Sequence, residues 1–394
     1  MSKATMTLAD RAAALDIQPG SCGVLDRACS SIGKKALRSR LAALEHGQIT
    51  LVDGMRRERY GHISPRCPLS CTVHVHDRRF YAEVALAGSV GAGESYMAGH
   101  WSADDLTALT RILLVNRDVL DRLERGLPRL SEPVRKLLHA IARNTRTGSR
   151  RNIAAHYDIG NDFFELFLDD TMMYSCAVFE RPGMTLEQAQ FAKLERICRK
   201  LDLRPGDHLL EIGTGWGTLA LHAASRYGCK VTTTTVSREQ HAQVRQRVDE
   251  AGLADRITLL ERDYRDLTGR YDKLVSIEMI EGVGHHYFDT FFRRCGELLM
   301  SGGTMVLQSI TIDDRQYAFA RDSVDFIKRH IFPGCCSPSV TALTQSSARA
   351  STLRVVDLED IGPHYVNTLA AWRSNLFANA AQARARGYPE ALVR

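Results

Sequence analysis

This sequence lacks several features that would assign it to a secreted, disulfide-stapled or membrane-spanning class. Its ten cysteines include no C-x-x-C pair, and the N-terminal segment MSKATMTLAD contains no apolar core typical of a signal peptide. No apolar run approaches the roughly 20 residues that a membrane-spanning helix requires. These absences predict a reduced, cytoplasmic protein that contacts a membrane only peripherally, at its inner face.

The composition is that of a globular protein. The 394 residues are 44% hydrophobic and 25% charged, which excludes a disordered chain and predicts two or three domains. The net charge is only +6, but residues 111–151 contain eleven basic and four acidic residues, a local net charge of +7. Such a stretch indicates an anionic partner, either a membrane surface or nucleic acid; a solvated linker is the alternative.

The pattern of apolar residues divides the chain into three parts. Residues 1–130 predict a small α+β domain with strands between residues 46 and 86, a glycine-rich turn near residues 91–99 and a helix after it. Residues 131–155 read as a basic connector. From residue 156 to 394, strands and helices alternate, with expected strands at 208–212, 230–236, 256–261, 273–278 and 304–312. This rhythm predicts an α/β fold with a doubly wound, mostly parallel sheet.

A glycine-rich loop follows the first strand of that sheet. The sequence E-I-G-T-G-W-G places Gly213, Gly215 and Gly217 between a strand and a helix, where glycine lets the backbone approach a ligand closely. A dinucleotide fingerprint has the spacing G-x-G-x-x-G and an acidic residue about 20 positions later, and both are missing here. The loop instead resembles motif I of S-adenosylmethionine-dependent methyltransferases. A tight strand–helix turn without a ligand is the alternative.

Further motifs occur in order along the chain: HYDIGNDFF (156–164), MYSCAVF (173–179), DYRDL (263–267), SIEMIEGVG (276–284), IFPGCCSPS (331–339) and GPHY (362–365). Together with the glycine loop, they resemble the cyclopropane-fatty-acyl-phospholipid synthases and their mycolic acid relatives. The resemblance is strong over residues 150–385 and weak in the N-terminal domain. It implies a Rossmann-like class I methyltransferase fold. Relatives continue beyond the final segment AAQARARGYPEALVR, so we expect a truncated C-terminus.

The resemblance implies a defined chemistry. Methyl transfer to a cis double bond creates a carbocation, and loss of a proton from the added methyl closes a three-membered ring. The site therefore needs a dry pocket and a base close to the new methyl. Family members hold a bicarbonate ion as this base, and the matching catalytic positions here are Cys176, Glu281, Gln308, Ile310 on the fifth strand and Tyr365. Gln308 stands where the family has histidine, and Glu278 is either a rival for the role of Glu281 or a contact to the cofactor ribose.

The resemblance also implies the binding sites. The cofactor is S-adenosylmethionine, held by Tyr174, Ser175, Gly213, Gly215, Gly217, Thr235, Ser237, Gln240, Tyr264 and Arg265. The segment TTTTVS (232–237) lacks the acidic residue that many methyltransferases use to bind the ribose, so Thr235, Ser237 and Gln240 would supply polar contacts instead. We expect no metal. The aromatic stretch 163–179 predicts either ordinary core or the wall of an acyl-chain channel, and the resemblance favours the channel.

The sequence thus predicts an enzyme that forms cyclopropane fatty acids on phospholipid acyl chains. Its partner would be a phospholipid bilayer with anionic headgroups rather than nucleic acid, and the N-terminal domain would also permit a homodimer. Because Gln308 replaces a histidine, a related methyltransferase that makes methyl- or methylene-branched chains is an alternative, as is a catalytically decayed lipid-binding homologue. A nicotinamide oxidoreductase and a nucleic-acid methyltransferase are weaker alternatives.

Overall fold

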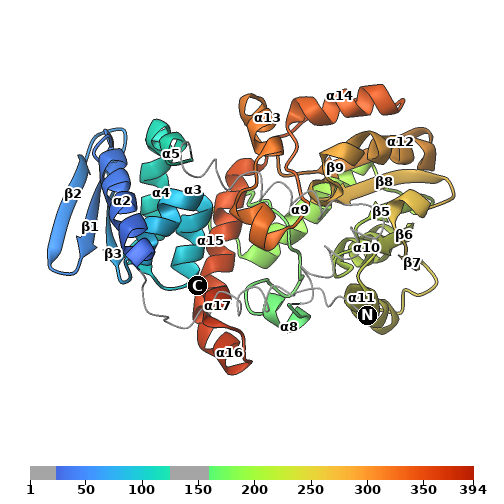
Figure 1. Ribbon diagram of the computed structural model, residues 1–394. Coiled ribbons are helices and arrows are strands. Elements are labelled where there is room, and N and C mark those ends of the chain that lie inside the picture. The colour runs from blue at the N-terminus through green and yellow to red at the C-terminus, as the bar shows by residue number, and fades with distance from the viewer. Residues whose placement is uncertain (1–23, 125–158) are drawn as a thin grey trace, which may run out of the picture. The chain divides into compact units, whose positions relative to one another are not determined.

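The computed structural model describes residues 24–124 and 159–394, which divide into two compact units (Figure 1). Unit 1 comprises residues 159–322 and 332–386 of this described part, and unit 2 comprises 24–124, 323–331 and 387–394. Two later segments, which the sequence analysis places in the methyltransferase domain, therefore belong to the N-terminal unit. The basic connector 131–155 and much of the basic stretch 111–151 lie outside the described residues.

Unit 2 contains a mixed sheet in the strand order β2-β1-β3-β4. The β1–β2 and β3–β4 pairs are antiparallel, and β1 and β3 are parallel. The elements are α2 (Val24–Leu41), β1 (Gly47–Asp53), β2 (Arg56–His62), β3 (Ser70–Val75), α3 (Arg79–Met97), β4 (Trp101–Ala103), α4 (Leu106–Val115) and α5 (Arg117–Glu124).

Helix α3 corrects the prediction for this region. Residues 79–86 are helical rather than extended, and the glycine-rich segment after them continues the helix across a kink at Gly88. Phe80, Val84 and Gly91 lie on its buried side at helical spacing. A Cβ on Gly91 would lie 2.1 Å from the carbonyl oxygen of Glu83. The glycines of α3 therefore permit a kink and close backbone packing, which sequence periodicity does not distinguish from a turn.

Unit 1 is built on the predicted doubly wound sheet, which is confirmed. Its five strands have the order β7-β6-β5-β8-β9, and all four pairings are parallel. The strands are β5 (His208–Ile212), β6 (Lys230–Thr235), β7 (Ile257–Glu261), β8 (Tyr271–Ile277) and β9 (Leu299–Gln308). One expectation is wrong: β9 ends at Gln308, so Ile310 lies in the loop after the strand.

Successive strand residues point to opposite faces, and each face of the sheet has its own apolar core. Leu209 faces a core that contains side chains of α9 (Leu186–Leu201), α10 (Thr218–His222) and α11 (Arg238–Glu250). Leu210 faces a second core built around α12 (Phe288–Leu298) (Figure 1). The two helical layers leave the carboxyl ends of the strands as the edge where ligands bind in such folds.

The other elements of unit 1 surround this edge or extend the helical layers. They are α8 (Asn161–Phe164), η1 (Ala223–Tyr227), η2 (Tyr264–Asp266), η3 (Ile280–Val283), η4 (His285–Tyr287), α13 (Asp314–Asp322), α14 (Val340–Ala350), α15 (Gly362–Ala378) and α16 (Ala380–Ala385). Unit 2 also holds η5 (Ile327–Ile331) and α17 (Glu390–Val393). Among the described residues, no helix is both long and apolar enough to cross a bilayer.

Candidate active site

The glycine loop leaves β5 at the carboxyl edge of the sheet. Gly213, Gly215 and Gly217 have φ values of 98°, 53° and 84°, a region that favours glycine. A Cβ on Gly215 would meet no atom within 4 Å, whereas a Cβ on Gly217 would lie 2.8 Å from a methyl carbon of Val244. Gly215 therefore borders open space where a ligand can approach the backbone, and Gly217 permits close packing of α10 against α11.

The buried donors near this loop that lack hydrogen-bond partners among the described residues include Gln240 Nε2 and the hydroxyl of Tyr264. Thr235 Oγ1 donates to Gln240 Oε1 at 2.9 Å, which fixes the amide. Ser237 Oγ accepts from the backbone N–H of Gln240 and caps α11. Buried polar groups normally have partners, so these two donors fit a polar ligand such as S-adenosylmethionine.

Three other predicted cofactor residues have partners inside the protein. The ring of Tyr174 packs against Trp372 at 5.2 Å between centroids, and Ser175 Oγ accepts a 2.6 Å hydrogen bond from Lys193 Nζ. The guanidinium of Arg265 pairs with Asp263 at 2.7 Å and lies over the ring of Tyr264. We therefore expect the Arg265 side chain to hold Tyr264 in place.

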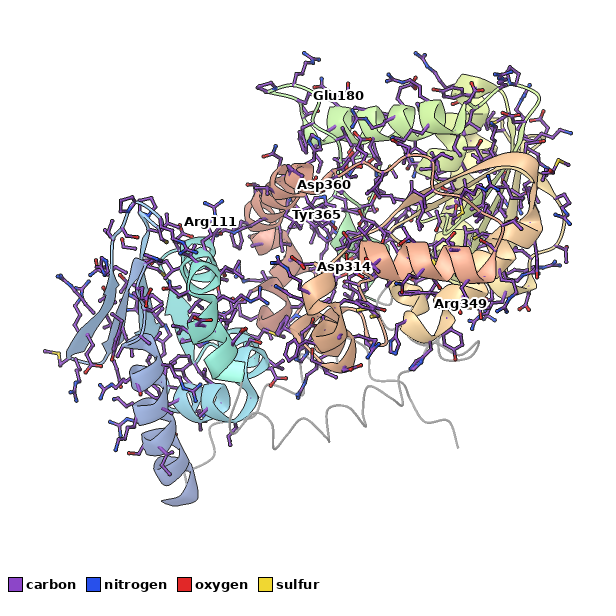
Figure 2. The ribbon with its side chains drawn as sticks, turned by 90° about the horizontal axis from the view of Figure 1, so that it is seen from above. Arg111, Glu180, Asp314, Arg349, Asp360 and Tyr365 are labelled. Atoms are coloured by element: carbon purple, nitrogen blue, oxygen red, sulfur yellow. The ribbon has the colours of Figure 1, made fainter. Side chains whose placement is uncertain are left out.

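A carboxylate stands at the end of β8. Glu278 has a φ of 45°, unusual for a residue other than glycine, and its backbone N–H donates to the carbonyl of Gln308 at 2.8 Å. Its Oε1 accepts from the backbone N–H of Cys176 (2.9 Å) and from Gln308 Nε2 (2.8 Å). Its Oε2 accepts from the hydroxyl of Tyr365 (3.2 Å), which is labelled on α15 in Figure 2. Three donors from separate segments thus converge on one carboxylate.

Glu281 is the second carboxylate of the site and lies in the turn η3. Its Oε1 accepts from Ser309 Oγ (2.9 Å) and from the backbone N–H of Ile310 (2.5 Å), while Oε2 has no partner among the described residues. Burial and the neighbouring charge of Glu278 raise the pKa of Glu281 to about 7. Burial also raises the pKa of Glu278. At neutral pH, one of these two coupled carboxyl groups therefore readily holds a proton.

The structure brings the five predicted catalytic residues together, but around two different groups. Cys176, Gln308 and Tyr365 face Glu278, whereas the backbone of Ile310 faces Glu281. Cys176 contributes its backbone N–H, and burial together with the charge of Glu278 raises the pKa of its thiol to about 12. The donors expected to hold a bicarbonate ion are thus engaged by a side-chain carboxylate, so these residues do not fit the ion.

Two buried polar residues of α9 support the site, and sequence reasoning missed both. Lys193 is 1% exposed, and burial lowers the pKa of its amine to about 8. Gln190 Nε2 donates to the carbonyls of Met173 and Ser175. Both lie on the helix face that also buries Leu194 and Ile197. The sequence offered one signal for both residues: each is polar but occupies a position that the 3.6-residue helical periodicity predicts to be buried.

Helix α15 holds the YSCA segment in place. Thr368 Oγ1 accepts from the backbone N–H of Ala177 (3.1 Å), and His364 Nδ1 accepts from that of Phe179 (3.3 Å). Proline 363 suits the first turn of the helix, where its missing N–H costs nothing. The GPHY and YSCAVF motifs therefore form one structural unit that positions Tyr365 and Cys176.

The aromatic stretch 163–179 is largely buried. Phe164 contacts Tyr174 and Trp216, and Phe167 contacts Trp372. Tyr365 contacts Trp372 as well, at 6.1 Å between ring centroids. These rings form a continuous apolar wall from the glycine loop to the carboxylates. In the described part of the chain, no group of three or more His, Cys, Asp or Glu side chains could hold a metal ion.

The acidic residue of the glycine loop makes folding stability depend on pH. Glu211 is buried, Thr233 Oγ1 donates to its Oε2, and burial raises the pKa of Glu211 to about 8. Stability from this raised pKa is fully present below the unfolded-state value near 4.5 and is lost as pH rises through 8. Glu211→Gln does not titrate. We expect its free energy of unfolding, relative to wild type, to increase by up to about 4 kcal/mol between pH 5 and 9.

Urea unfolding of both proteins at pH 5, 7 and 9 checks this expectation. Glu250→Gln, on the exposed side of α11, is the matched control and should follow the wild type at each pH. Parallel pH dependence for Glu211→Gln and wild type would contradict a buried, neutral Glu211.

Comparison with known proteins gives a consistent result. The family described as mycolic acid cyclopropane synthetase matches residues 144–394. Tuberculostearic acid methyltransferase UfaA1 of Mycobacterium tuberculosis is 36% identical over 379 residues, covering 94% of this chain and 87% of the relative. Cyclopropane-fatty-acyl-phospholipid synthase of Escherichia coli is 36% identical over 308 residues, covering 78% and 76%.

Solved structures extend the similarity to the fold and the cofactor. The mycolic acid cyclopropane synthase CmaA1, in complex with SAH and CTAB, is 37% identical and has a TM-score of 0.57. The alignment covers 61% of this chain and 87% of that one. Coclaurine N-methyltransferase, at 20% identity and a TM-score of 0.50, shares the fold alone. Unit 1 therefore has the class I methyltransferase fold.

Proposed function

Because the chain belongs to the mycolic acid cyclopropane synthetase family and is an S-adenosylmethionine-dependent methyltransferase, we propose that it methylates the cis double bond of unsaturated phospholipid acyl chains, forming cyclopropane fatty acids. The observation that carries this proposal is the pair of half-buried residues Glu278 and Glu281, whose carboxylates lie at the carboxyl edge of the sheet. Methyl transfer to oxygen or nitrogen needs no base at the transferred methyl, but ring closure does.

The residues of the site suit each part of this reaction. Bound S-adenosylmethionine supplies an electrophilic methyl group on a sulfonium. Gln240, Tyr264 and the backbone at Gly215 would hold the cofactor at the ends of β5, β6 and β7. The wall formed by Phe164, Phe167, Tyr174 and Trp372 would exclude water and accommodate the acyl chain. The negative charge at Glu278 would stabilise a developing carbocation.

A methyl- or methylene-branched chain is a second candidate product. Gln308 replaces the histidine of the family pattern, and its amide is committed to Glu278 at 2.8 Å. A glutamine donates a hydrogen bond but cannot carry charge, so it does not act as an acid or a base. The similarity to a tuberculostearic acid methyltransferase over 94% of the chain also favours this product. Both candidate products begin with the same methylation of the alkene. They differ in which chain carbon carries the positive charge when the proton is lost.

The proposed partner is the surface of a phospholipid bilayer with anionic headgroups, reached from its inner face. The local charge of +7 in residues 111–151 supports this, since each basic residue near such a surface contributes about 1 kcal/mol. The proposal includes no nucleic-acid partner. A homodimer remains compatible with it.

Product analysis tests the proposed function. The protein is incubated with S-adenosylmethionine and vesicles of dioleoyl phosphatidylglycerol, and the recovered fatty acids are analysed by proton NMR. We expect upfield ring-methylene signals; exomethylene or new methyl signals would establish the second candidate. Vesicles of a saturated phospholipid are the control and should yield neither. Absence of any carbon-methylated chain, with the cofactor still bound, would contradict both candidates and leave the decayed lipid-binding alternative.

A further inference from the structure

The site contains its own anion at the place where the family pattern predicts an external one. The positions expected to hold bicarbonate include Cys176, Gln308 and Tyr365, and all three direct a donor at the carboxylate of Glu278. A side-chain carboxylate and a bicarbonate ion present the same planar pair of oxygens to such donors. The two therefore compete for one place, and the side chain, being covalently attached, occupies it at every concentration of the ion.

We propose that Glu278 is the base of this enzyme and that the wild-type protein works without bicarbonate. This inference rests on the proposed function, namely methylation of an acyl double bond. It concerns one residue of that site, Glu278, which the sequence analysis considers as a rival to Glu281 or as a ribose contact.

The hydrogen bonds of Glu278 identify the oxygen that would receive the proton. Oε1 accepts two hydrogen bonds, at 2.9 and 2.8 Å, whereas Oε2 accepts only the longer one from Tyr365, at 3.2 Å. Oε2 therefore has a lone pair available for a new bond. Glu278 is half-buried as a residue, and the proposed role requires substrate atoms to reach its Oε2.

The proposed step is balanced without another reactant. The bond from sulfur to the methyl carbon breaks as this carbon bonds to one alkene carbon, which leaves the positive charge on the other alkene carbon. A C–H bond of the added methyl then breaks. Its electron pair closes the ring, or forms the exomethylene bond after a hydride shift, and its proton goes to Glu278 Oε2. The neutral acid later returns the proton to solvent.

Burial is the largest influence on Glu278 and raises its pKa, which makes its carboxylate a stronger base. The buried amine of Lys193 and the donors at Cys176, Gln308 and Tyr365 all stabilise the carboxylate. An ionised Glu281 would disfavour the charged form of Glu278 because the two charges repel. A protonated Glu281 would have much less effect on Glu278. In its ionised form, Glu278 is thus a base held by partners that do not need to move.

The backbone of Glu278 offers a sharp test. Its φ of 45° is readily adopted by glycine, so Glu278→Gly should keep the fold while removing the carboxylate. The three donors would then be free to hold an external anion. Glu278→Gln is the matched control, because its amide fills the same place without providing a base.

The experiment combines two measurements. Binding of ¹³C-bicarbonate is detected by NMR line broadening. Turnover on oleoyl phospholipid vesicles is measured in CO₂-free buffer and again after bicarbonate is added. Binding of SAH by calorimetry establishes that each variant is folded. We expect wild type to bind no bicarbonate and to turn over equally in both buffers. Glu278→Gly should bind the ion and regain at least tenfold activity with it, and Glu278→Gln should do neither.

The results separate this inference from the proposed function. Bicarbonate binding by the wild type, or wild-type turnover that needs the ion, would overturn the inference and leave the function intact. Failure of Glu278→Gly to bind bicarbonate would overturn the inference as well, because the three donors would then not form an anion-binding site. If the wild type yields no methylated chain in either buffer, the proposed function fails, and the binding results still decide which anion occupies the place.

Discussion

Glu278→Gln is expected to lower turnover by about 10²–10⁴-fold, the range that a positioned general base contributes. Glutamine has nearly the same shape as glutamate and still accepts through its Oε1 from Gln308 Nε2 and the backbone N–H of Cys176. The variant should therefore fold normally and lose only the ability to take up a proton. The measurement is single-turnover kinetics on oleoyl phospholipid vesicles, with SAH affinity measured in parallel.

The separation between chemistry and binding is the decisive part of this prediction. SAH affinity should stay within a few-fold of wild type, because Glu278 belongs to the carboxylate cluster and not to the glycine loop. Glu250→Gln, an exposed substitution of the same type on α11, should leave both quantities unchanged. Turnover of Glu278→Gln within threefold of wild type would exclude Glu278 as the base.

Alanine substitutions of two neighbouring glycines should affect different properties: folding stability at Gly217 and cofactor affinity at Gly215. Gly217→Ala combines an unfavourable positive φ, costing about 1–2 kcal/mol, with a Cβ 2.8 Å from Val244. Overpacking of this kind adds typically about 1–3 kcal/mol. We expect Gly217→Ala to lose about 2–5 kcal/mol of unfolding free energy.

Gly215→Ala should retain more stability yet bind cofactor poorly. Its added Cβ meets no protein atom within 4 Å, so only the cost of the positive φ remains. The same Cβ would extend into the space where the cofactor approaches the backbone, and we expect at least a tenfold loss of S-adenosylmethionine affinity. Urea unfolding and calorimetric titration of both variants check the pair. Equal losses of stability with unchanged affinity would contradict the assignment of Gly215 to the cofactor site.

Periodicity and motif order were sufficient to predict the parallel sheet and the glycine loop. Strands such as His208–Ile212 are short apolar runs bounded by turn residues, and these local signals coincide with the final structure. Helix α3 was not predictable in the same way. Its glycines have the composition of a turn, and their role in close packing depends on Glu83 and other backbone atoms that only the folded unit brings near.

The candidate site was predictable in its members but not in its arrangement. The family resemblance selected Cys176, Glu281, Gln308, Ile310 and Tyr365. It did not indicate that Glu278 would accept the hydrogen bonds, because this depends on a left-handed backbone conformation at the end of β8. Lys193 was missed for a related reason. Its sequence context is an ordinary amphipathic helix, and only the packing of α9 buries its amine beside Ser175.

The central claim is that the site removes a proton from the methyl group it has just transferred to an alkene. The most direct test uses S-adenosylmethionine with a fully deuterated methyl group, oleoyl phospholipid vesicles and mass spectrometry of the methylated fatty acid. Cyclopropane and methylene-branched products both retain two deuterium atoms, because Glu278 takes up the third. A methylated acyl chain that retains all three would contradict the account, since the base would then act elsewhere or not at all.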